Sequence, residues 1–583
     1  MRRLLCLSAL AGFALANSFS FVVLGDRTGI ANDSVFSRVL EEIRLLRPDF
    51  VVGTGDLIEG YTDDIVAAAA EWDAVLAMLD RTGVPGYFAP GNHDIWSPAS
   101  ESLFVRRVNP ATWSLAHRNS IFIFCDNTRW QRFADWPAEQ RRRFRAELKK
   151  ARRYQHRFVL MHRPWWRYAL ERGEPDTLHE WCREAGITHV FTGHDHFYSS
   201  HIRDSISYFQ VGPSGSRLKV HYDRARGGFQ NYLFGQVIGR HVSLAVVEPG
   251  RLHPAEFVTV GAVAELTRAA NSAVALEPVP VMPGRPVDAR RRLAVTDITD
   301  LGQRGTLAWR AEGTAWRVTP ESLGFLLPPG GRGEYDLRVE LADPARPWPP
   351  PRLALPWNHS GDRHTELEIP LPVARRARAA APVSPDPADA GWAAALPLAA
   401  FAGDDYLPGR VEPVEVRVGF DSLNIHLVAR CRESRPDLIT AEVTGRDESV
   451  YSDDHLNFVL DPDPAATREW AARFAATGDS SLTSPWYYQL FVNPLGTVAD
   501  RRCRLVGSRS ERSWSWNGNW TVTADRSEDG WWTVTVSCPL AELGDRGGDW
   551  GINCTRYQSR LRATATWQPP FRHDPRTFGT LER

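Results

Sequence analysis

Up to about residue 255, the chain alternates short apolar runs with longer stretches in which apolar residues recur at helical spacing. Runs such as FSFVVLG (19–25), DFVVGTG (49–55) and THVFTG (188–193) have the length and composition of buried strands. The stretches between them, for example 63–80, predict helices. Strands that alternate with helices in this way indicate an α/β domain over residues 17–255, with helices on both faces.

Farther along the chain the pattern changes to strands alone. Residues 283–373 show short alternating runs punctuated by Pro and Gly, which is typical of an immunoglobulin-like β-sandwich. Residues 256–282 form a connector that precedes it. Residues 374–391 are rich in Ala, Pro and charge without an apolar period, so we expect an exposed linker. Residues 392–583 return to strands and predict a second β-sandwich.

Residues 1–16 have a basic start, an apolar run and a small-x-small end at Ala14–Ala16. This order is that of a signal peptide cut after Ala16, and the alternative is a buried first strand. No later stretch reaches the ~18 uninterrupted apolar residues that a membrane-spanning helix needs. We therefore expect a secreted or periplasmic protein without a transmembrane segment.

The charge balance limits the choice of partners. The 583 residues carry a net charge of −1 at neutral pH, so no global basic field attracts nucleic acid. Nucleic acid is not an expected partner, although a local basic groove at 141–153 keeps a nuclease open as an alternative. Of the seven cysteines, all but Cys6 follow the signal peptide. Buried thiols and disulfides in the last domain both fit their apolar surroundings.

Polar residues follow five of the predicted strands of the α/β domain. These endings read GDRTG, GDLIE, GNHD, MHRP and GHDH. One such ending is usually a turn or a helix cap, but five in one order, each offering Asp, Asn or His, indicate a common site. In α/β folds, reactive groups gather beyond the carboxyl ends of strands. The polar residues that these endings offer are Asp26, Asp56, Glu59, Asn92, His93, Asp94, His162, His194 and His196.

The order and wording of these endings resemble the calcineurin-like metallophosphoesterase superfamily. The resemblance implies a four-layer αββα sandwich that holds two divalent metal ions, one bound by Asp26, Asp56 and His196 and the other by Asp56, Asn92, His162 and His194, with Asp56 bridging. Carboxylate, amide and imidazole ligands without a thiolate suit Mn, Fe or Zn. A hydroxide shared by the metals would attack phosphorus in a phosphomonoester or phosphodiester.

The resemblance also assigns the acid chemistry. His93 of GNHD would be the general acid that protonates the leaving group. Glu59 matches a carboxylate that orients this histidine in relatives, and Asp94 is the competing orienter, with a turn cap as its structural alternative.

The first ending departs from the family pattern, because Thr28 stands where a metal-ligating His is usual. A neutral hydroxyl binds divalent ions weakly. We therefore expect looser occupancy there, with water filling the gap or Thr28 bonding to a bound oxyanion. A single tight metal or an inactive domain is the alternative.

Side chains next to the ligands are candidates for substrate binding. Arginines at 27 and 163 can clamp phosphate oxygens, and the indole of Trp165 can form a pocket wall for a sugar or base. Simple packing of the Pro164 loop explains the last two equally well. The full set is Arg27, Thr28, Asn92, Arg163 and Trp165.

The last domain resembles family 9 carbohydrate-binding modules, through its strands DDHLNFVLDP, YYQLFVNPLG and GWWTVTVSCPL. A sugar-binding face needs exposed aromatic rings, although alternating aromatics in a strand are more often core. The acidic pair Asp453 and Asp454 suggests a structural calcium site. The aromatic candidates are Trp514, Trp516, Trp520, Trp531, Tyr487 and Tyr488.

Two functions follow from these patterns. The leading one is an exported metal-dependent phosphoesterase, with a C-terminal domain that binds glycan or packs on its own catalytic domain. The alternative is a glycan-binding surface protein whose phosphoesterase-like domain is inactive because of Thr28. Turnover of aryl phosphates with added metal separates the two.

Overall fold

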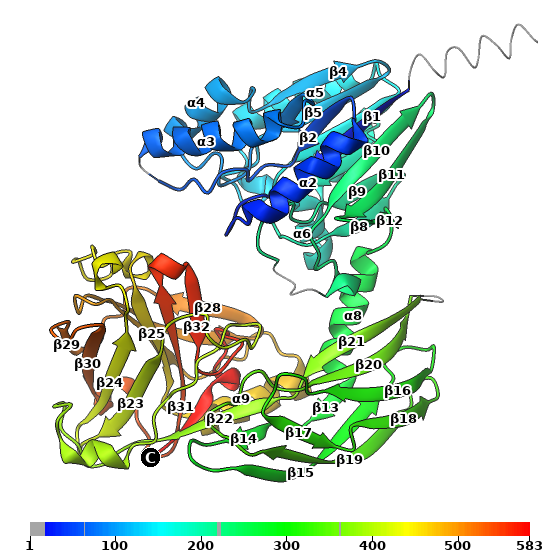
Figure 1. The fold of residues 1–583 in the computed structure, drawn as a ribbon. Helices are drawn as coiled ribbons and strands as arrows, with labels where there is room; N and C mark the ends of the chain where they lie inside the picture. The colour runs from blue at the N-terminus through cyan, green and yellow to red at the C-terminus, as the bar shows by residue number, and fades with distance from the viewer. Residues whose placement is uncertain (1–17, 63, 219–222, 361–362) are drawn as a thin grey trace, which may run out of the picture. The chain divides into compact units, whose positions relative to one another are not determined.

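The structure, a computed structural model, describes residues 18–62, 64–218, 223–360 and 363–583, so the predicted signal peptide lies outside the described residues. The chain divides into two compact units (Figure 1). Unit 1 runs to Ala269 and includes the segment His359–Thr365, and unit 2 comprises Ala270–Asn358 and Glu366–Arg583. Among the described residues, no helix is both long and apolar enough to cross a membrane.

Unit 1 contains two six-stranded mixed sheets. The parallel strands lie at one side of the first sheet and in the centre of the second. In the first sheet three parallel strands continue into three antiparallel ones. It has the order β12 (Arg251–Pro254), β11 (His241–Glu248), β10 (Tyr232–Ile238), β1 (Phe19–Leu24), β2 (Phe50–Gly53), β3 (Gly86–Phe88). The second has the order β4 (Trp113–His117), β5 (Ser120–Cys125), β6 (His156–Met161), β7 (His189–Thr192), β9 (Ile206–Gln210), β8 (Ser199–Arg203).

Alternate residues of the strands build two different cores in unit 1. Phe21 of β1 packs against Phe122 and Phe158 of the second sheet, with ring centroids 5.1 and 5.4 Å apart. Its neighbours Val22 and Leu24 point the other way and pack with the helices, because successive side chains of a strand face opposite sides. The space between the sheets is therefore largely aromatic.

Helices cover the outer face of each sheet (Figure 1). Their apolar residues recur at helical spacing, as in the first helix, where Phe36, Val39, Leu40 and Ile43 are buried. The predicted four-layer αββα arrangement is confirmed. The first sheet is covered by α2 (Asp33–Leu46), α3 (Ile65–Asp80) and α4 (Pro98–Arg107), and the second by α5 (Ala138–Ala151), α6 (Trp165–Arg172) and α7 (Thr177–Ala185).

The aromatic layer includes the titratable ring of His189, which makes unit 1 sensitive to acid. His189 stacks on Phe191 and Phe209, and burial together with nearby His156 lowers the pKa of His189 to about 4. The unfolded chain takes up a proton below about pH 6.5, whereas the folded chain does not until about pH 4. Stability is therefore complete above pH 6.5 and falls on acidification, by at most about 1.4 kcal/mol per pH unit. In His189→Phe we expect a smaller loss between pH 6.5 and 4, measured by urea unfolding. An unchanged pH dependence would contradict this assignment.

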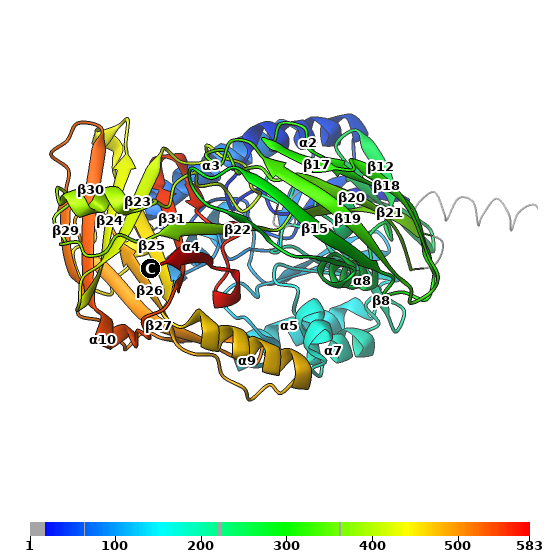
Figure 2. The same cartoon turned by 90° about the horizontal axis from the view of Figure 1, so that it is seen from below.

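The first part of unit 2 is a β-sandwich of two four-stranded sheets, as predicted. Figure 2 shows the long strands β15 and β19 side by side. One sheet has the order β13 (Val274–Leu276), β15 (Val287–Thr296), β19 (Arg332–Leu341), β17 (Trp316–Thr319). The other has the order β18 (Ser322–Leu327), β16 (Gln303–Arg310), β20 (Arg352–His359), β21 (Arg363–Pro370).

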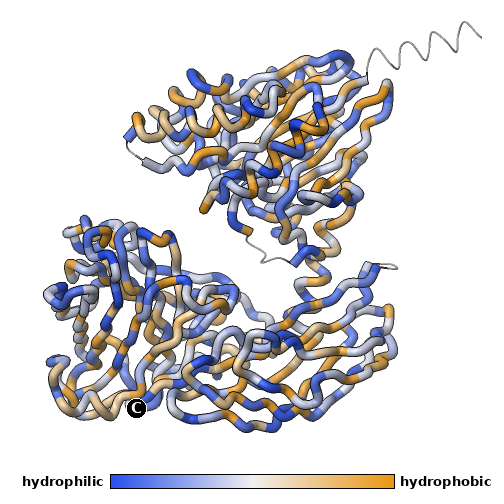
Figure 3. Tube along the Cα trace, viewed as in Figure 1, coloured by the Kyte–Doolittle hydropathy of each residue, from blue (hydrophilic) through white to orange (hydrophobic). Residues whose placement is uncertain are grey.

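The second part of unit 2 is a larger β-sandwich, also as predicted. Apolar and polar residues alternate along its strands (Figure 3), and one apolar core lies between its two sheets. The four-stranded sheet has the order β23 (Val414–Phe420), β24 (Asn424–Arg432), β30 (Trp531–Pro539), β29 (Thr521–Asp525). The nine-stranded sheet contains β14 (Val279–Val281), β22 (Val373–Arg378), β33 (Gly579–Glu582), β31 (Trp550–Gln558), β25 (His455–Asp461), β26 (Tyr487–Val492), β27 (Val498–Val506), β28 (Arg509–Ser513) and β32 (Ala563–Thr566).

The structure differs from the sequence prediction at the two segments between domains. The predicted linker 374–391 is not exposed throughout, because β22 pairs with β33 and with β14 from the predicted connector. The segment VARRAR forms a strand that its composition did not indicate. Val373, Arg375 and Ala377 are its buried positions, and an arginine is not expected at a buried position of a strand. The sequence left both buried thiols and disulfides open for the cysteines. All six cysteines in the described residues are buried free thiols.

Candidate metal centre

Five loops of unit 1 bring the predicted ligands to one place. The loops follow β1, β2, β3, β6 and β7, which run parallel within their sheets. Parallel strands end at the same edge, so residues far apart in sequence meet there. Asp26, Asp56, Asn92, His162 and the His194–His196 pair are all contributed in this way.

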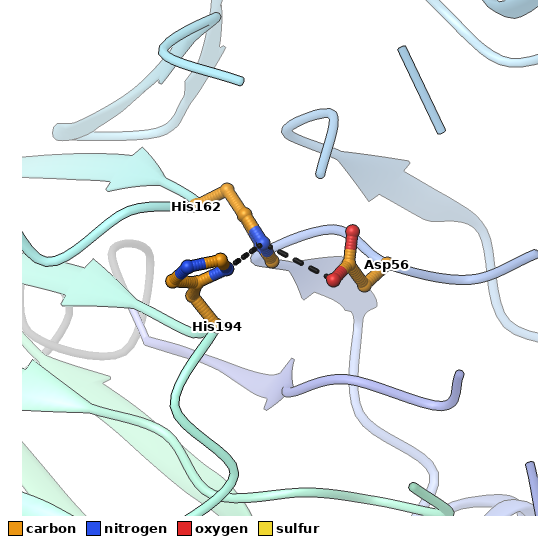
Figure 4. Close-up of side chains that lie close together, drawn as sticks. All are labelled: Asp56, His162 and His194. Carbon is orange, nitrogen blue, oxygen red and sulfur yellow. Dashed lines mark hydrogen bonds and ion pairs between the residues drawn. The ribbon is translucent and has the colours of Figure 1, made fainter. Parts of the chain in front are cut away.

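One group of potential ligands surrounds a single ring nitrogen. The Nε2 atom of His162 lies 3.2 Å from Asp56 Oδ2, 3.0 Å from His194 Nδ1 and 2.9 Å from Asn92 Oδ1. Asp56, His162 and His194 offer ligand atoms within 4.8 Å of one another (Figure 4). An arrangement of two imidazoles, a carboxylate and an amide oxygen has the composition of a transition-metal site.

A second group shares Asp56 with the first. Asp26, Asp56 and His196 also offer ligand atoms within 4.8 Å of one another, and His196 Nε2 lies 3.3 Å from Asp26 Oδ2. Within the described residues, Asp26 Oδ1 is buried and has no hydrogen-bond partner. Two carboxylates that are each 1% exposed need a cationic partner. The residues present therefore fit a pair of divalent cations, with Asp56 positioned to bridge them.

The glycines of two motifs make room for these carboxylates. A Cβ on Gly91 would lie 2.1 Å from Asp56 Oδ1, and a Cβ on Gly193 would lie 2.3 Å from Asp26 Oδ1. Real Cβ atoms do not approach oxygen that closely, so any larger residue would displace the ligand. This explains why the GNHD and GHDH endings carry glycine at these positions.

The histidine ligands are fixed through their second ring nitrogens. His162 Nδ1 lies 2.9 Å from the carbonyl oxygen of Thr54, and His196 Nδ1 lies 2.7 Å from that of Arg217. A carbonyl accepts from a protonated nitrogen, which leaves Nε2 of each ring to face the carboxylates. Burial lowers the pKa of His162, but the Asp56 carboxylate outweighs it and raises that pKa to about 9. The proton on this pair is the one that a cation would replace.

Asp94 organises the loop that carries Asp56. Its fully buried carboxylate accepts hydrogen bonds from the backbone N–H groups of Asp56, Leu57, Ile58 and Gly91, at 2.8 to 3.3 Å. It is therefore a clamp on two loops of the site and not an orienter of His93.

The side chain of Glu59 does not orient His93 either, in contrast to the prediction. His93 Nδ1 donates to the backbone carbonyl of Glu59, at 2.6 Å. The Glu59 carboxylate instead accepts from Ala31 N–H at 2.9 Å. Burial raises the pKa of Glu59, but the Ala31 N–H, together with nearby Thr28 and His93, outweighs it and lowers that pKa. Glu59 thus supports the loop after Asp26, whereas the Thr28 hydroxyl is buried and has no hydrogen-bond partner among the described residues.

Two of the predicted substrate-binding residues, Arg27 and Trp165, bond to structural partners. Arg27 donates to Asp33 and to the carbonyl of Leu57. Trp165 is buried, donates to the carbonyl of Trp130 and packs against Phe133 and Trp136. Both were predicted from their place next to a ligand, but their loops turn the side chains into the core.

Arg163 lies beside the first group of ligands. Its Nε donates to the carbonyl of Thr128 at 2.8 Å, and its Nη1 lies 2.9 Å from His194 Nε2. The guanidinium therefore contacts a predicted ligand directly, and its cation stands at the edge of the site. Of the two predicted arginines, this one alone reaches the ligand cluster.

Tyr61 is part of the site but carries no signal in the sequence. Its hydroxyl accepts from Asn92 Nδ2 at 3.1 Å, and its ring contacts His93 edge to face, with centroids 4.9 Å apart. An aromatic residue in a loop after a glycine matches no motif, so only the fold reveals this contact.

Most of the predicted glycan-binding aromatics belong to the core of the last sandwich. Tyr487, Tyr488 and Trp520 are buried, and Arg430 covers the ring of Trp531 at 4.3 Å. Trp516 packs on Tyr488. Trp514 alone among the six candidates is half exposed, with Arg501 over its ring at 4.0 Å.

Backbone N–H groups donate hydrogen bonds to both carboxylates of the acidic pair of this domain. Asp453 accepts from the N–H groups of Glu442 and Val443, and Asp454 from those of Thr440 and Ser559. These bonds give the carboxylates a structural role, so the structure does not support the predicted calcium site.

Comparison with known proteins bears on both units. Residues 19–198 match the family model of calcineurin-like phosphoesterases. No curated protein matches the chain in sequence.

Three solved structures are similar in fold. GAP50, the anchor in the inner membrane complex of Plasmodium, is 13% identical over 41% of this chain and 88% of that chain, with a TM-score of 0.31. A dimetal phosphatase from Danio rerio is 13% identical over 41% of this chain and 99% of that chain, with a TM-score of 0.30. A family 9 carbohydrate-binding module from Caldicellulosiruptor kristjanssonii in complex with glucose is 12% identical over 36% of this chain and 94% of that chain, with a TM-score of 0.23.

Proposed function

Residues 19–198 form a calcineurin-like phosphoesterase domain, and from this premise we propose that the protein hydrolyses a phosphoric ester with the help of divalent metal ions. The observation that carries the proposal is the pair of ligand groups that share Asp56. A bridging carboxylate between two cations is the arrangement that two-metal hydrolysis requires. Bound there, the ions would supply an activated water and offset the charge that develops on the phosphoryl oxygens.

The residues of the chain divide the remaining work. Asp26, Asp56, Asn92, His162, His194 and His196 would hold two ions of the type Mn, Fe or Zn. His93 is held through Nδ1 by the Glu59 carbonyl, which leaves Nε2 to give a proton to the leaving oxygen. Arg163 adds positive charge beside His194. The substrate is a phosphomonoester or a phosphodiester.

The test is turnover of an aryl phosphate and a bis(aryl) phosphate by the full chain, after removal of metal with EDTA and re-addition of Mn, Fe or Zn. We expect hydrolysis of at least one of the two esters, dependent on added metal and abolished in His162→Ala. No hydrolysis with any of the three metals, while the ions bind, would overturn the proposal. It would favour the alternative, an inactive domain in a glycan-binding protein.

Substitution of Glu59 and substitution of His93 should affect the rate differently. From the sequence we expected the Glu59 carboxylate to orient His93, but His93 is held by the Glu59 backbone carbonyl. His93→Asn removes the proton donor, so we expect a loss of about 10²–10⁴-fold in kcat for esters of poorly acidic alcohols and a smaller loss for activated aryl esters. Glu59→Gln leaves the backbone carbonyl in place, and we expect the ratio of the two rates to stay within about twofold. A ratio in Glu59→Gln that matches the one in His93→Asn would show that the carboxylate orients the ring after all.

For the last sandwich we propose a glycan-binding role centred on Trp514. The support is that the ring is half exposed although Arg501 lies over it at 4.0 Å, since the apolar faces of sugars stack on indoles. Titration with a glucose oligomer, followed by Trp fluorescence, tests it. Equal binding by the full chain and by Trp514→Ala would refute this role.

Export of the chain also stays a proposal, supported by the basic and apolar pattern of residues 1–16. Expression with the native N-terminus, followed by N-terminal sequencing of the protein outside the cytoplasm, tests it. A mature protein that still begins at Met1 would refute cleavage.

A further inference from the structure

Tyr61 contacts two of the groups on which the proposed reaction depends, and we propose that it binds the leaving group. The ring of Tyr61 recognises an alcohol that itself carries a planar ring, such as an aryl or nucleoside group, and its hydroxyl fixes the amide of Asn92. This inference rests on the proposed phosphoesterase function and names its substrate class.

The loop that presents Tyr61 is tightly held. Gly60 N–H donates to the Glu71 carboxylate at 3.0 Å, and a Cβ on Gly60 would lie 1.9 Å from the carbonyl oxygen of His93. Gly60 and Tyr61 both adopt the left-handed region, with φ of 56° and 51°. A bulky side chain rarely takes this conformation, and such residues cluster at functional sites. Asp56, His194 and His196 share it.

The hydroxyl of Tyr61 sets the orientation of a predicted metal ligand. It accepts a hydrogen bond from Asn92 Nδ2, at 3.1 Å. This bond turns Asn92 Oδ1 to the opposite side, where it lies 2.9 Å from His162 Nε2. The hydroxyl keeps its own proton, which can be donated to a substrate oxygen. Tyr61 is therefore a positioning residue for Asn92.

The ring of Tyr61 lies beside the proposed proton donor. It meets His93 edge to face at 4.9 Å and Trp96 at 5.9 Å, with the latter planes tilted by 38°. A general acid must contact the leaving oxygen, so the alcohol has to lie next to His93 and thus next to Tyr61. The side chain nevertheless remains 57% exposed. A large aromatic surface that stays open beside the acid suits a planar group that stacks on it.

The test compares two non-hydrolysable ligands of equal charge, phenylphosphonate and methylphosphonate. Their binding to the full chain loaded with Mn is measured by calorimetry. We expect the wild type to bind phenylphosphonate about three- to tenfold more tightly, a preference that Tyr61→Ala abolishes and Tyr61→Phe retains. Tyr61→Phe removes the partner of Asn92, so its affinity for Mn should fall about tenfold. Phe257→Ala is the matched control, since Phe257 is an exposed aromatic of unit 1 that contacts Phe229 and His253.

The inference is overturned if the wild type shows no preference, if Tyr61→Ala keeps it, or if Phe257→Ala loses it to the same extent. Failure of the proposed function gives a different result. In that case the wild type still prefers phenylphosphonate through Tyr61 but hydrolyses neither phenyl phosphate nor methyl phosphate. If the wild type hydrolyses both esters and Tyr61→Ala still prefers phenylphosphonate, the role of Tyr61 is refuted while the proposed phosphoesterase function stands.

Discussion

Asp56→Asn is expected to lose both metal ions and roughly 10³-fold or more of the turnover, because Asp56 belongs to both ligand groups. The substitution keeps the size of the side chain but removes the charge that offsets the repulsion between two cations. In the wild type, Asp56 Oδ2 also lies 3.2 Å from His162 Nε2, and Asp56 Oδ1 accepts a hydrogen bond from His93 N–H at 2.8 Å. The loss should therefore exceed that of any ligand that serves one ion.

Metal content by mass spectrometry and turnover by the same preparation measure this effect together. Asp204→Asn is the matched control, since Asp204 is an exposed carboxylate of unit 1 that pairs with His179 at 2.9 Å. We expect the control to keep the metal content and rate of the wild type. Two bound ions and normal turnover in Asp56→Asn would exclude the bridging role.

Asp94→Ala is expected to destabilise unit 1 by roughly 3–5 kcal/mol and to abolish turnover. The substitution leaves four buried backbone N–H groups without an acceptor, those of Asp56, Leu57, Ile58 and Gly91. An unsatisfied buried donor costs about 1–3 kcal/mol, and partial relaxation reduces the sum. Burial and the neighbouring Asp56 raise the pKa of Asp94, and the N–H groups of Gly91 and Leu57 offset this rise only in part.

Hydrogen exchange of the amides in 54–60 measures the effect locally, which separates it from the unfolding of the second compact unit. Asp94→Asn keeps one acceptor oxygen and should fall between the wild type and Asp94→Ala. If instead Asp94→Ala kept the stability of the wild type and changed only the rates with poor leaving groups, Asp94 would act through His93, as an orienter.

The sequence by itself determined the classes of structure and indicated the residues that meet at the candidate metal centre. Apolar runs such as FSFVVLG mark buried strands, and the period of two along a strand then fixes which of its side chains share a face, because that spacing is local. The candidate ligands could also be found in the sequence, since each of the five endings places Asp, Asn or His directly after a strand. Parallel strands bring such endings to one edge of a sheet, so the sequence alone predicts that these side chains lie close together.

Tertiary structure decided what the neighbours of the ligands do. Glu59, Arg27 and Trp165 stand close to ligands in the sequence, yet their side chains point to Ala31, Asp33 and Trp130. Adjacency in the chain does not fix the direction of a side chain in a loop, because loop backbone lacks a repeating geometry. Tyr61 reaches Asn92 from 31 positions away. Such a contact depends on how two loops pack, which no local pattern encodes.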